Sequence, residues 1–277
     1  MPRRSFYRRA PLRGAFFIFS TLLATASPAT VPECPLPAGS ERVRVKHVTD
    51  GDTLRLADDR RLRLIGINAP ESRRGEHPPQ PLATAAGAAL EALLEQQGYL
   101  LTLHFDSSRQ DHYRRLLAHA SLPDGSNPAE HLLEQGLATA LAVPPNTGMA
   151  DCYQRLEQRA RATRRGIWAL PAYRSVAAAG LRPDARGFRL VQGRIHEVRH
   201  SRHSVWLQLD GPLAARIARR DLAHFPSDYP DSLLGQRVEL RGWLKPDGDG
   251  LKVSIRHPAA ITRLVDGQPP EEKIRSD

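Results

Sequence analysis

The sequence predicts an α+β protein that is mostly β: a small five-stranded Greek-key barrel carrying three helices, followed by a second small β-barrel. Short segments with strand periodicity begin at Glu41 and resume at Phe188, a helical stripe interrupts the first set, and the composition changes between residues 174 and 187. A chain of 277 residues is long enough for two domains with separate cores. Its 40% hydrophobic and 25% charged residues argue against a mainly disordered protein.

The first predicted strands alternate with a period of two. In "RVRVKHV", "TLRL" and "RLRLIGI" apolar residues recur at every second position, which places one face of each strand against a core. The inward residues are Val43 and Val45, Leu54 and Leu56, and Leu62 and Leu64. Arg63 lies on the opposite face. "LLTLHFD" and "RRLLAHASLPDG" predict a further strand pair, the second ending at an Asp-Gly turn.

Three helices are expected in this first unit. "PLATAAGAALEALLEQQG" carries an apolar stripe and ends at Gly98. The stripe consists of Leu82, Ala86, Leu90, Leu93 and Leu94. "NPAEHLLEQG" has an Asn at its start and a Gly at its end, and "ADCYQRLEQRARATRRG" is expected to begin at an Asp cap. This order of strands and helices predicts an OB-like barrel with helices packed on it.

The composition break separates this unit from a second set of strands. Residues 41–172 are expected to form the first domain, 173–187 a linker, and 188–265 a second, OB-like β domain in which "DGDG" makes a hairpin turn. Residues 27–40 would be an N-terminal segment and 266–277 a disordered tail. In the second barrel Phe188, Trp206 and Trp243 could stack on bases, although core packing is the expected role of at least two of them.

Residues 1–26 have the three parts of an export signal. A basic stretch, "PRRSFYRRAPLRG", precedes a short apolar run and a small-residue cleavage site near Ala26. Removing it would lower the formal net charge by five, from +10 to +5. The apolar run is too short for a comfortable bilayer crossing, so no stable membrane span is expected, and an uncleaved anchor is the alternative. We therefore expect an exported protein, periplasmic or secreted.

The two cysteines fit that compartment. Cys34 lies just after the leader and Cys152 far downstream. In an oxidising environment such a pair favours a disulfide that ties the N-terminal segment to the body, and the alternative is two unrelated thiols.

Acidic and basic residues gather around two predicted turns. "TDGDT" carries Asp50 and Asp52, and "RLRLIGINAPES" brings Arg63 together with Asn68 and Glu71. Hydrolysis of a phosphodiester needs cations that hold the phosphate oxygens, a metal that spreads the developing charge, and a base near the attacking water. Asp50 is expected to make the turn itself. The other residues are the types that such chemistry requires.

The order of these motifs carries a resemblance. "VTDGDTLRL", "RLRLIGINAPES", "DHYRRLLAHA", "EQGLA" and "RRGIW" follow one another at suitable spacing between residues 43 and 168. This segment resembles the staphylococcal nuclease (thermonuclease) family. The resemblance implies an endonuclease, a thermonuclease-like phosphodiester hydrolase that cuts DNA and RNA with little sequence preference. The rest of the chain lies outside it.

The resemblance also implies roles for single residues. Asp52 would be the main metal carboxylate, Asn68 stands at a second ligand position, and Ala69 would lend its backbone carbonyl to Ca²⁺, which prefers oxygen ligands. The remaining roles concern the substrate. Glu71 would orient or deprotonate the attacking water, Arg63 and Arg115 would clamp the phosphate, and Tyr113 would approach a substrate phosphate.

Three departures from the family pattern bear on activity. Asn68 replaces the usual second Asp and brings no charge, so weaker metal binding is expected. Arg114 stands where the family has Gly. In "LAVPPNT" Val143 and Pro144 replace aromatic residues and cannot stack on a base.

Two other function classes compete with the enzyme. One is a degenerate barrel that binds nucleic acid or another polyanion without cutting it. In either class of nucleic-acid protein, the expected partner is single-stranded DNA or RNA. The second competing class is an envelope scaffold that binds a protein partner. The presence of Glu71, Arg63 and Arg115 together favours the enzyme, because pure binding needs no base.

Overall fold

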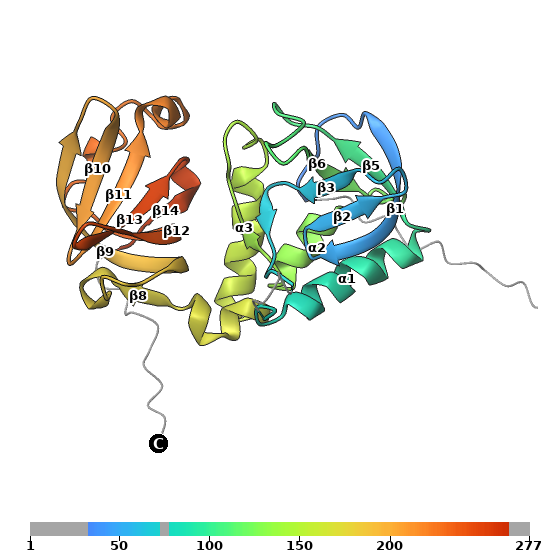
Figure 1. The fold of residues 1–277 in the computed structure, drawn as a ribbon, viewed down its shortest axis with the longest axis horizontal. Coiled ribbons are helices and arrows are strands. Elements are labelled where there is room, and N and C mark those ends of the chain that lie inside the picture. The colour runs from blue at the N-terminus through green and yellow to red at the C-terminus, as the bar shows by residue number, and fades with distance from the viewer. Residues whose placement is uncertain (1–32, 73–77, 266–277) are drawn as a thin grey trace, which may run out of the picture.

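The computed structural model describes residues 33–72 and 78–265, which form two β-barrels beside each other with helix α3 between them (Figure 1). The predicted export signal, most of the N-terminal segment and the tail from residue 266 lie outside the described residues. Within these residues, none of the helices has the length and apolar character needed to cross a bilayer.

The first barrel closes in the strand order β1-β2-β3-β6-β5. Its strands are β1 (Glu41–Asp50), β2 (Thr53–Leu56), β3 (Arg61–Leu64), β5 (Leu100–His104) and β6 (Leu116–Ser121). All neighbours are antiparallel except β3 and β6, which run parallel. The inward residues predicted from the alternation are all buried in one core. The five-stranded barrel is therefore confirmed.

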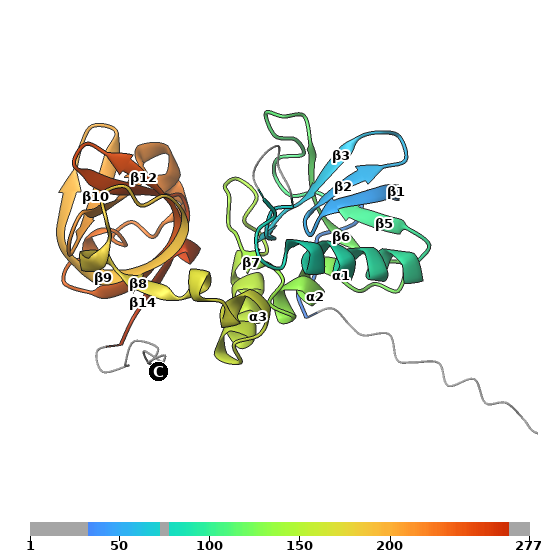
Figure 2. The same ribbon diagram turned by 60° about the horizontal axis from the view of Figure 1, so that its bottom comes forward.

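The second barrel repeats this topology. Strands β9 (Gly187–His200), β10 (Ser204–Leu209), β11 (Leu213–Ala218), β13 (Gly250–Ile255) and β12 (Arg237–Asp247) follow one another around it, and β12 pairs with β9 to close the ring (Figure 2). Its parallel pair, β11 with β13, corresponds to β3 with β6. The short strands β8 (Ser175–Ala177) and β14 (Ile261–Arg263) extend its edges, so part of the segment expected as a linker pairs with the sheet.

Three α-helices are found in the described part of the chain, as expected: α1 (Ala83–Gln96), α2 (Pro128–Glu134) and α3 (Ala150–Ala162). Helix α2 begins as predicted, because the side chain of Asn127 accepts the Ala129 N–H at 2.9 Å. The predicted Asp cap of α3 is wrong. The cap position is Met149, and Asp151 lies in the first turn. There its negative charge still interacts favourably with the positive end of the helix dipole.

A disulfide between Cys34 and Cys152 joins the start of the described chain to α3 across 118 residues. The predicted pairing is thus confirmed. Next to it, Glu130 of α2 accepts the backbone N–H groups of Glu33 and Cys34 at 3.1 and 2.7 Å. Together these contacts fix the segment before β1 on the helical face of the first barrel.

Charged pairs connect the two barrels. Arg241 of β12 reaches α3, where its guanidinium donates to both carboxylate oxygens of Glu157 at 2.5 and 2.8 Å. Arg161 of α3 makes the reverse pairing with Glu239 of β12 at 2.5 and 2.6 Å. Glu157 is fully buried and Glu239 nearly so. These reciprocal pairs set the orientation of the second barrel against α3.

Candidate active site

The two predicted turns meet at one end of the first barrel. The turn between β1 and β2 supplies Asp50 and Asp52, and β3 leads through Gly66 into the short strand β4 (Ile67–Asn68). Asp50 accepts the backbone N–H of Asp52 at 3.1 Å, which is the turn-making role expected for it. Asp52, in contrast, points into the protein and is 5% exposed.

The carboxylate of Asp52 is surrounded by donors. Its Oδ2 accepts the Ala69 N–H at 2.7 Å and forms an ion pair with Arg63 Nη1 at 2.5 Å, and its Oδ1 accepts the Thr53 hydroxyl at 3.1 Å. Burial nevertheless raises the pKa of Asp52 to about 7, against the lowering effect of Arg63 and with a smaller raising effect from Asp50. Burial therefore disfavours the charged form of the Asp52 carboxyl group in this site.

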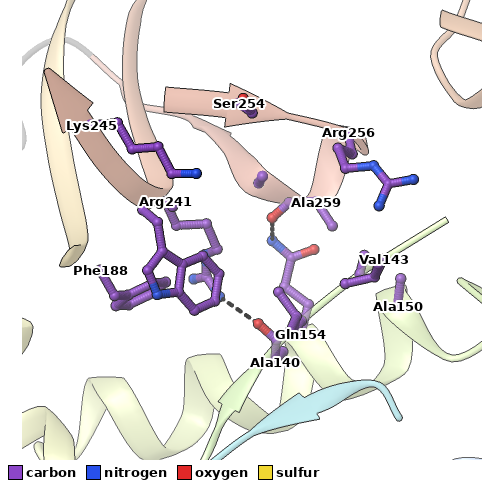
Figure 3. Close-up of a pocket in the computed structure, with 15 residues that line it drawn as sticks. Ala140, Val143, Ala150, Gln154, Phe188, Arg241, Lys245, Ser254, Arg256 and Ala259 are labelled. Atoms are coloured by element: carbon purple, nitrogen blue, oxygen red, sulfur yellow. Dashed lines mark hydrogen bonds between the residues drawn. The ribbon is translucent and has the colours of Figure 1, made fainter. Parts of the chain in front are cut away.

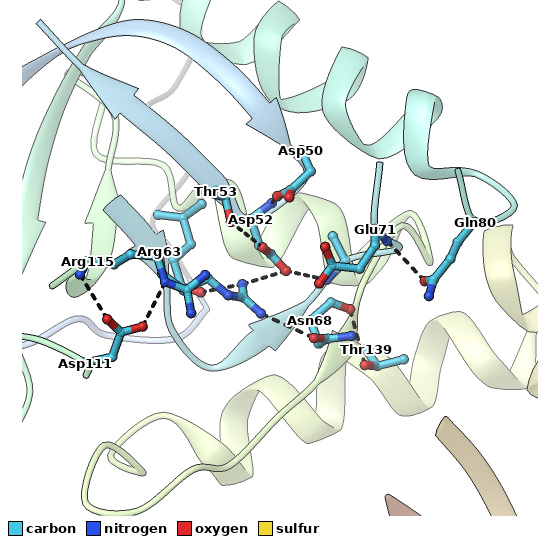
Figure 4. A network of polar contacts seen from close by, with 12 residues as sticks. Asp50, Asp52, Thr53, Arg63, Asn68, Glu71, Gln80, Asp111, Arg115 and Thr139 are labelled. Carbon is cyan, nitrogen blue, oxygen red and sulfur yellow. Dashed lines mark hydrogen bonds and ion pairs between the residues drawn. The ribbon is translucent and has the colours of Figure 1, made fainter. Parts of the chain in front are cut away.

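Asn68 faces the same guanidinium. Strand β4 pairs with β7 (Thr139–Ala140), which orients the side chain so that Asn68 Oδ1 accepts from Arg63 Nη2 at 3.3 Å (Figure 4). The oxygens of Asp52 and Asn68 therefore converge on one position that already attracts a cation. This oxygen-donor set fits a hard divalent ion such as Ca²⁺, although it contains a single carboxylate. Ala69, the third expected ligand, directs its N–H toward Asp52.

No group of three or more His, Cys, Asp or Glu side chains suited to a metal occurs in residues 33–72 and 78–265. The expected ligand set does not conflict with this, because two of its three members are an amide side chain and a backbone carbonyl. Such a set depends on few charges, and we expect correspondingly weak binding.

Glu71 and Arg115 line one cleft beside this cluster. The cleft has a volume of about 410 Å³, and Asp50 and Thr53 also border it. The backbone of Glu71 is fixed by Gln80, whose side chain accepts the Glu71 N–H at 3.1 Å and whose own N–H donates to the Glu71 carbonyl at 2.9 Å. In Figure 4 the Glu71 side chain points toward Asp52. The structure thus brings the expected base and one of the expected phosphate clamps to a shared surface.

Asp111, which precedes β6, holds the Arg115 side chain in place. Asp111 accepts the Arg115 Nε–H at 2.8 Å and the Arg115 backbone N–H at 2.9 Å. The Arg115 guanidinium also lies 5.7 Å from the ring centre of Tyr113, whose side chain is 55% exposed. Arg114, at the position of the family's Gly, adopts the left-handed conformation with φ of 62°. The turn geometry therefore survives without glycine, at a cost in strain.

The sequence comparisons bear on this arrangement. The family described as "Staphylococcal nuclease homologue" matches residues 61–170, a span that contains all the expected site residues except Asp52. A thermonuclease of Staphylococcus intermedius is 33% identical over 131 residues, which cover 46% of this chain and 76% of that protein. The chain belongs to the staphylococcal nuclease family.

Further relatives agree with this membership. A thermonuclease of Staphylococcus hyicus is 30% identical over 135 residues, covering 47% of this chain and 78% of that protein. The SPbeta prophage-derived endonuclease YokF of Bacillus subtilis is 32% identical over 136 residues, 47% of this chain and 45% of that protein. Membership of the staphylococcal nuclease family places the chain among nucleases. Its second barrel lies beyond the family match.

One feature of this nuclease-family site was missed by the sequence interpretation. A second cleft, of about 430 Å³, begins at Arg63 and Arg115 and extends past Val143 and Pro144 to Arg256 of the second barrel. Arg256 donates to the Pro144 carbonyl at 3.1 Å. No local pattern around residue 256 identifies this contact, because it depends on how the two barrels pack.

Proposed function

We propose that this protein is an exported, metal-assisted endonuclease that hydrolyses DNA, RNA or both with little sequence preference. The observation that carries the proposal is the convergence of Asp52 and Asn68 on Arg63, next to a cleft that Glu71 and Arg115 line. Membership of a nuclease family supports the reaction class, and the positions of these side chains support their roles.

In the proposed mechanism Glu71 orients the attacking water and accepts its proton. Arg63 and Arg115 hold the phosphate oxygens and stabilise the charge that develops on them. A Ca²⁺ ion held by Asp52, Asn68 and the Ala69 carbonyl would neutralise part of that charge. Arg63 is paired with Asp52 in the free protein, so substrate binding shifts this guanidinium from carboxylate to phosphate.

Tyr113 and Asp111 complete the proposed site. Tyr113 would approach a substrate phosphate, and its exposure beside the guanidinium of Arg115 supports this role. Asp111 acts through Arg115 by fixing its Nε side. We therefore treat Asp111 as a positioning residue and Tyr113 as a binding residue.

The domain organisation and the compartment belong to the same proposal. Residues 41–172 would form the nuclease domain and 188–265 a C-terminal OB-like domain, with 173–187 connecting them. The Cys34–Cys152 disulfide supports an oxidising environment, periplasmic or extracellular, in line with the basic and apolar leader.

A binding module without cleavage is the second candidate. Asn68 supplies no charge, and Arg63 already occupies the oxygens of both expected side-chain ligands. A protein in which the guanidinium replaces the metal would bind polyanions through Arg63 and Arg115 and would leave them intact.

The two candidates differ in one assay. The purified protein without its leader is incubated with a labelled single-stranded DNA in Ca²⁺ or in chelator, beside Glu71→Gln as the matched, near-isosteric control. The nuclease proposal predicts fragments that require Ca²⁺ and are strongly reduced with Glu71→Gln. Intact DNA with the parent, together with salt-sensitive binding, would favour the binding module.

A further inference from the structure

A groove separates the two barrels on the side of the proposed active site. It has a volume of about 430 Å³ and lies between residues 140–143 and α3 on one side and strands β12 and β13 on the other. Figure 3 shows Lys245 and Arg256 of the second barrel opposite Val143 and Gln154 of the first. The hydrogen bond from Gln154 Nε2 to the Ala259 carbonyl, 3.4 Å, joins the two walls of this groove, and Figure 3 shows it between Lys245 and Arg256.

The groove is continuous with the second cleft, which begins at Arg63 and Arg115 of the proposed active site. Leu141, Val143 and Arg256 line both of them. A chain-like ligand that leaves Arg63 and Arg115 can therefore pass Val143 and enter the groove between the barrels. The two features form one path along the protein.

The chemistry of the groove is cationic and aromatic. Its lining includes Arg241, Lys245 and Arg256 and no Asp or Glu. Arg241 forms an ion pair with Glu157, and Arg256 Nε lies 3.4 Å from Asp221 Oδ1. Lys245, in contrast, is exposed to solvent. The wall of the groove therefore suits an anionic ligand.

Trp243 supplies a stacking surface in the same groove. Trp243 lies between Arg241 and Lys245 on the outer face of β12, because every second residue of a strand points to the same side. It is 44% exposed. Phe188 contacts it edge to face, with ring centres 5.2 Å apart, and leaves part of the indole accessible. Phe188 and Trp206 are half-buried, so the aromatic residue most open to a ligand in this barrel is Trp243.

We propose that this groove is a binding subsite for single-stranded nucleic acid that continues from the active site. A base stacks on Trp243, while Lys245 and Arg256 contact neighbouring phosphates. A single strand is favoured over a duplex because stacking needs a free base face. The subsite would also supply a stacking surface that the first barrel lacks at Val143 and Pro144, which are not aromatic. This inference rests on the proposed nuclease function, whose path it extends.

The test uses tryptophan fluorescence, because the chain has three tryptophans and they occupy different environments. A single-stranded DNA of about 12 nucleotides is titrated into the full chain carrying Glu71→Gln, which keeps the strand intact. Trp243→Phe and Trp206→Phe are matched variants, since both remove one partly exposed indole of the second barrel. The strand should quench the fluorescence of the parent and of Trp206→Phe, and the quenching should disappear with Trp243→Phe.

Affinity gives a second readout. Trp243→Ala should raise the Kd for the same strand by about 5- to 150-fold, the range that the loss of one stacked base gives. Unchanged quenching with Trp243→Phe, an unchanged Kd with Trp243→Ala, or an equal loss of affinity for a blunt duplex would overturn the subsite.

Failure of this inference is distinguishable from failure of the nuclease proposal. A parent protein that cleaves DNA while Trp243→Ala binds normally contradicts only the subsite. A parent that binds through Trp243 and never cleaves contradicts only the nuclease.

Discussion

The buried pair between the barrels gives the sharpest prediction on stability. Glu157 is fully buried, and its carboxylate receives two hydrogen bonds from Arg241 and one, at 2.5 Å, from the Ala140 N–H. The variant Arg241→Met keeps the apolar length of the side chain and removes both guanidinium contacts. The carboxylate is then left in the interior with one donor. Breaking a buried pair in this way costs about 3–5 kcal/mol in the free energy of unfolding.

Urea denaturation followed by circular dichroism measures this loss, and a double variant isolates its cause. Glu157→Gln in the Arg241→Met background removes the buried charge, so most of the lost stability should return. A matched control is Arg159→Met, whose ion pairs on the same helix lie at the surface and should be worth less than about 1 kcal/mol. A cost for Arg241→Met as small as that of the control would refute the reasoning, as would a double variant no more stable than the single one.

Three further predictions concern the first domain. The pKa of Asp52 is about 7 in the folded protein and about 4 when unfolded, so folding takes up a proton between these values and stability falls as the pH rises from 4 to 7. In chelator, the free energy of unfolding of Asp52→Asn should therefore rise relative to the parent by about 4 kcal/mol over this pH range. Urea unfolding measures it, and parallel curves of stability against pH would contradict it. Reduction of the Cys34–Cys152 bond should cost about 2–5 kcal/mol, seen as a lower Tm with reductant that a Cys34→Ser variant does not show; a reductant-insensitive parent would count against a stabilising bridge. Arg114→Gly should raise the free energy of unfolding by about 0.5–1 kcal/mol, because φ is 62° there, and a lower urea midpoint would show that the turn is not strained.

Much of the fold is encoded in local patterns. Val43, Val45, Leu54 and Leu56 alternate on strands that the structure confirms, because period-two burial is visible in the sequence alone. The cap of α3, in contrast, was predicted wrongly. Asp151 is a good capping residue by type, yet the helix begins at Ala150, and the residue at the cap position, Met149, makes no capping hydrogen bond with its side chain.

The candidate site was partly predictable from the sequence. Asp52, Arg63 and Asn68 were expected to gather, because strand ends in a small barrel bring their turns together, and the structure places them in direct contact. That Asp52 and Asn68 each contact a different nitrogen of the Arg63 guanidinium was not visible in the sequence. The groove at Trp243 and Arg256 was also hidden, since it exists only through the packing of β12 and β13 against α3.

The departure at Asn68 offers the most direct test of the central claim, which is that these residues catalyse metal-assisted cleavage. The rate of single-stranded DNA cleavage is measured across a Ca²⁺ titration for the parent, Asn68→Asp and Glu71→Gln. The account predicts cleavage by the parent, half-saturation at a lower Ca²⁺ concentration with Asn68→Asp because a charge is added to the oxygen set, and loss of cleavage at every Ca²⁺ concentration with Glu71→Gln. A parent that leaves DNA intact at saturating Ca²⁺, or a Glu71→Gln variant that cuts as fast as the parent, would contradict it.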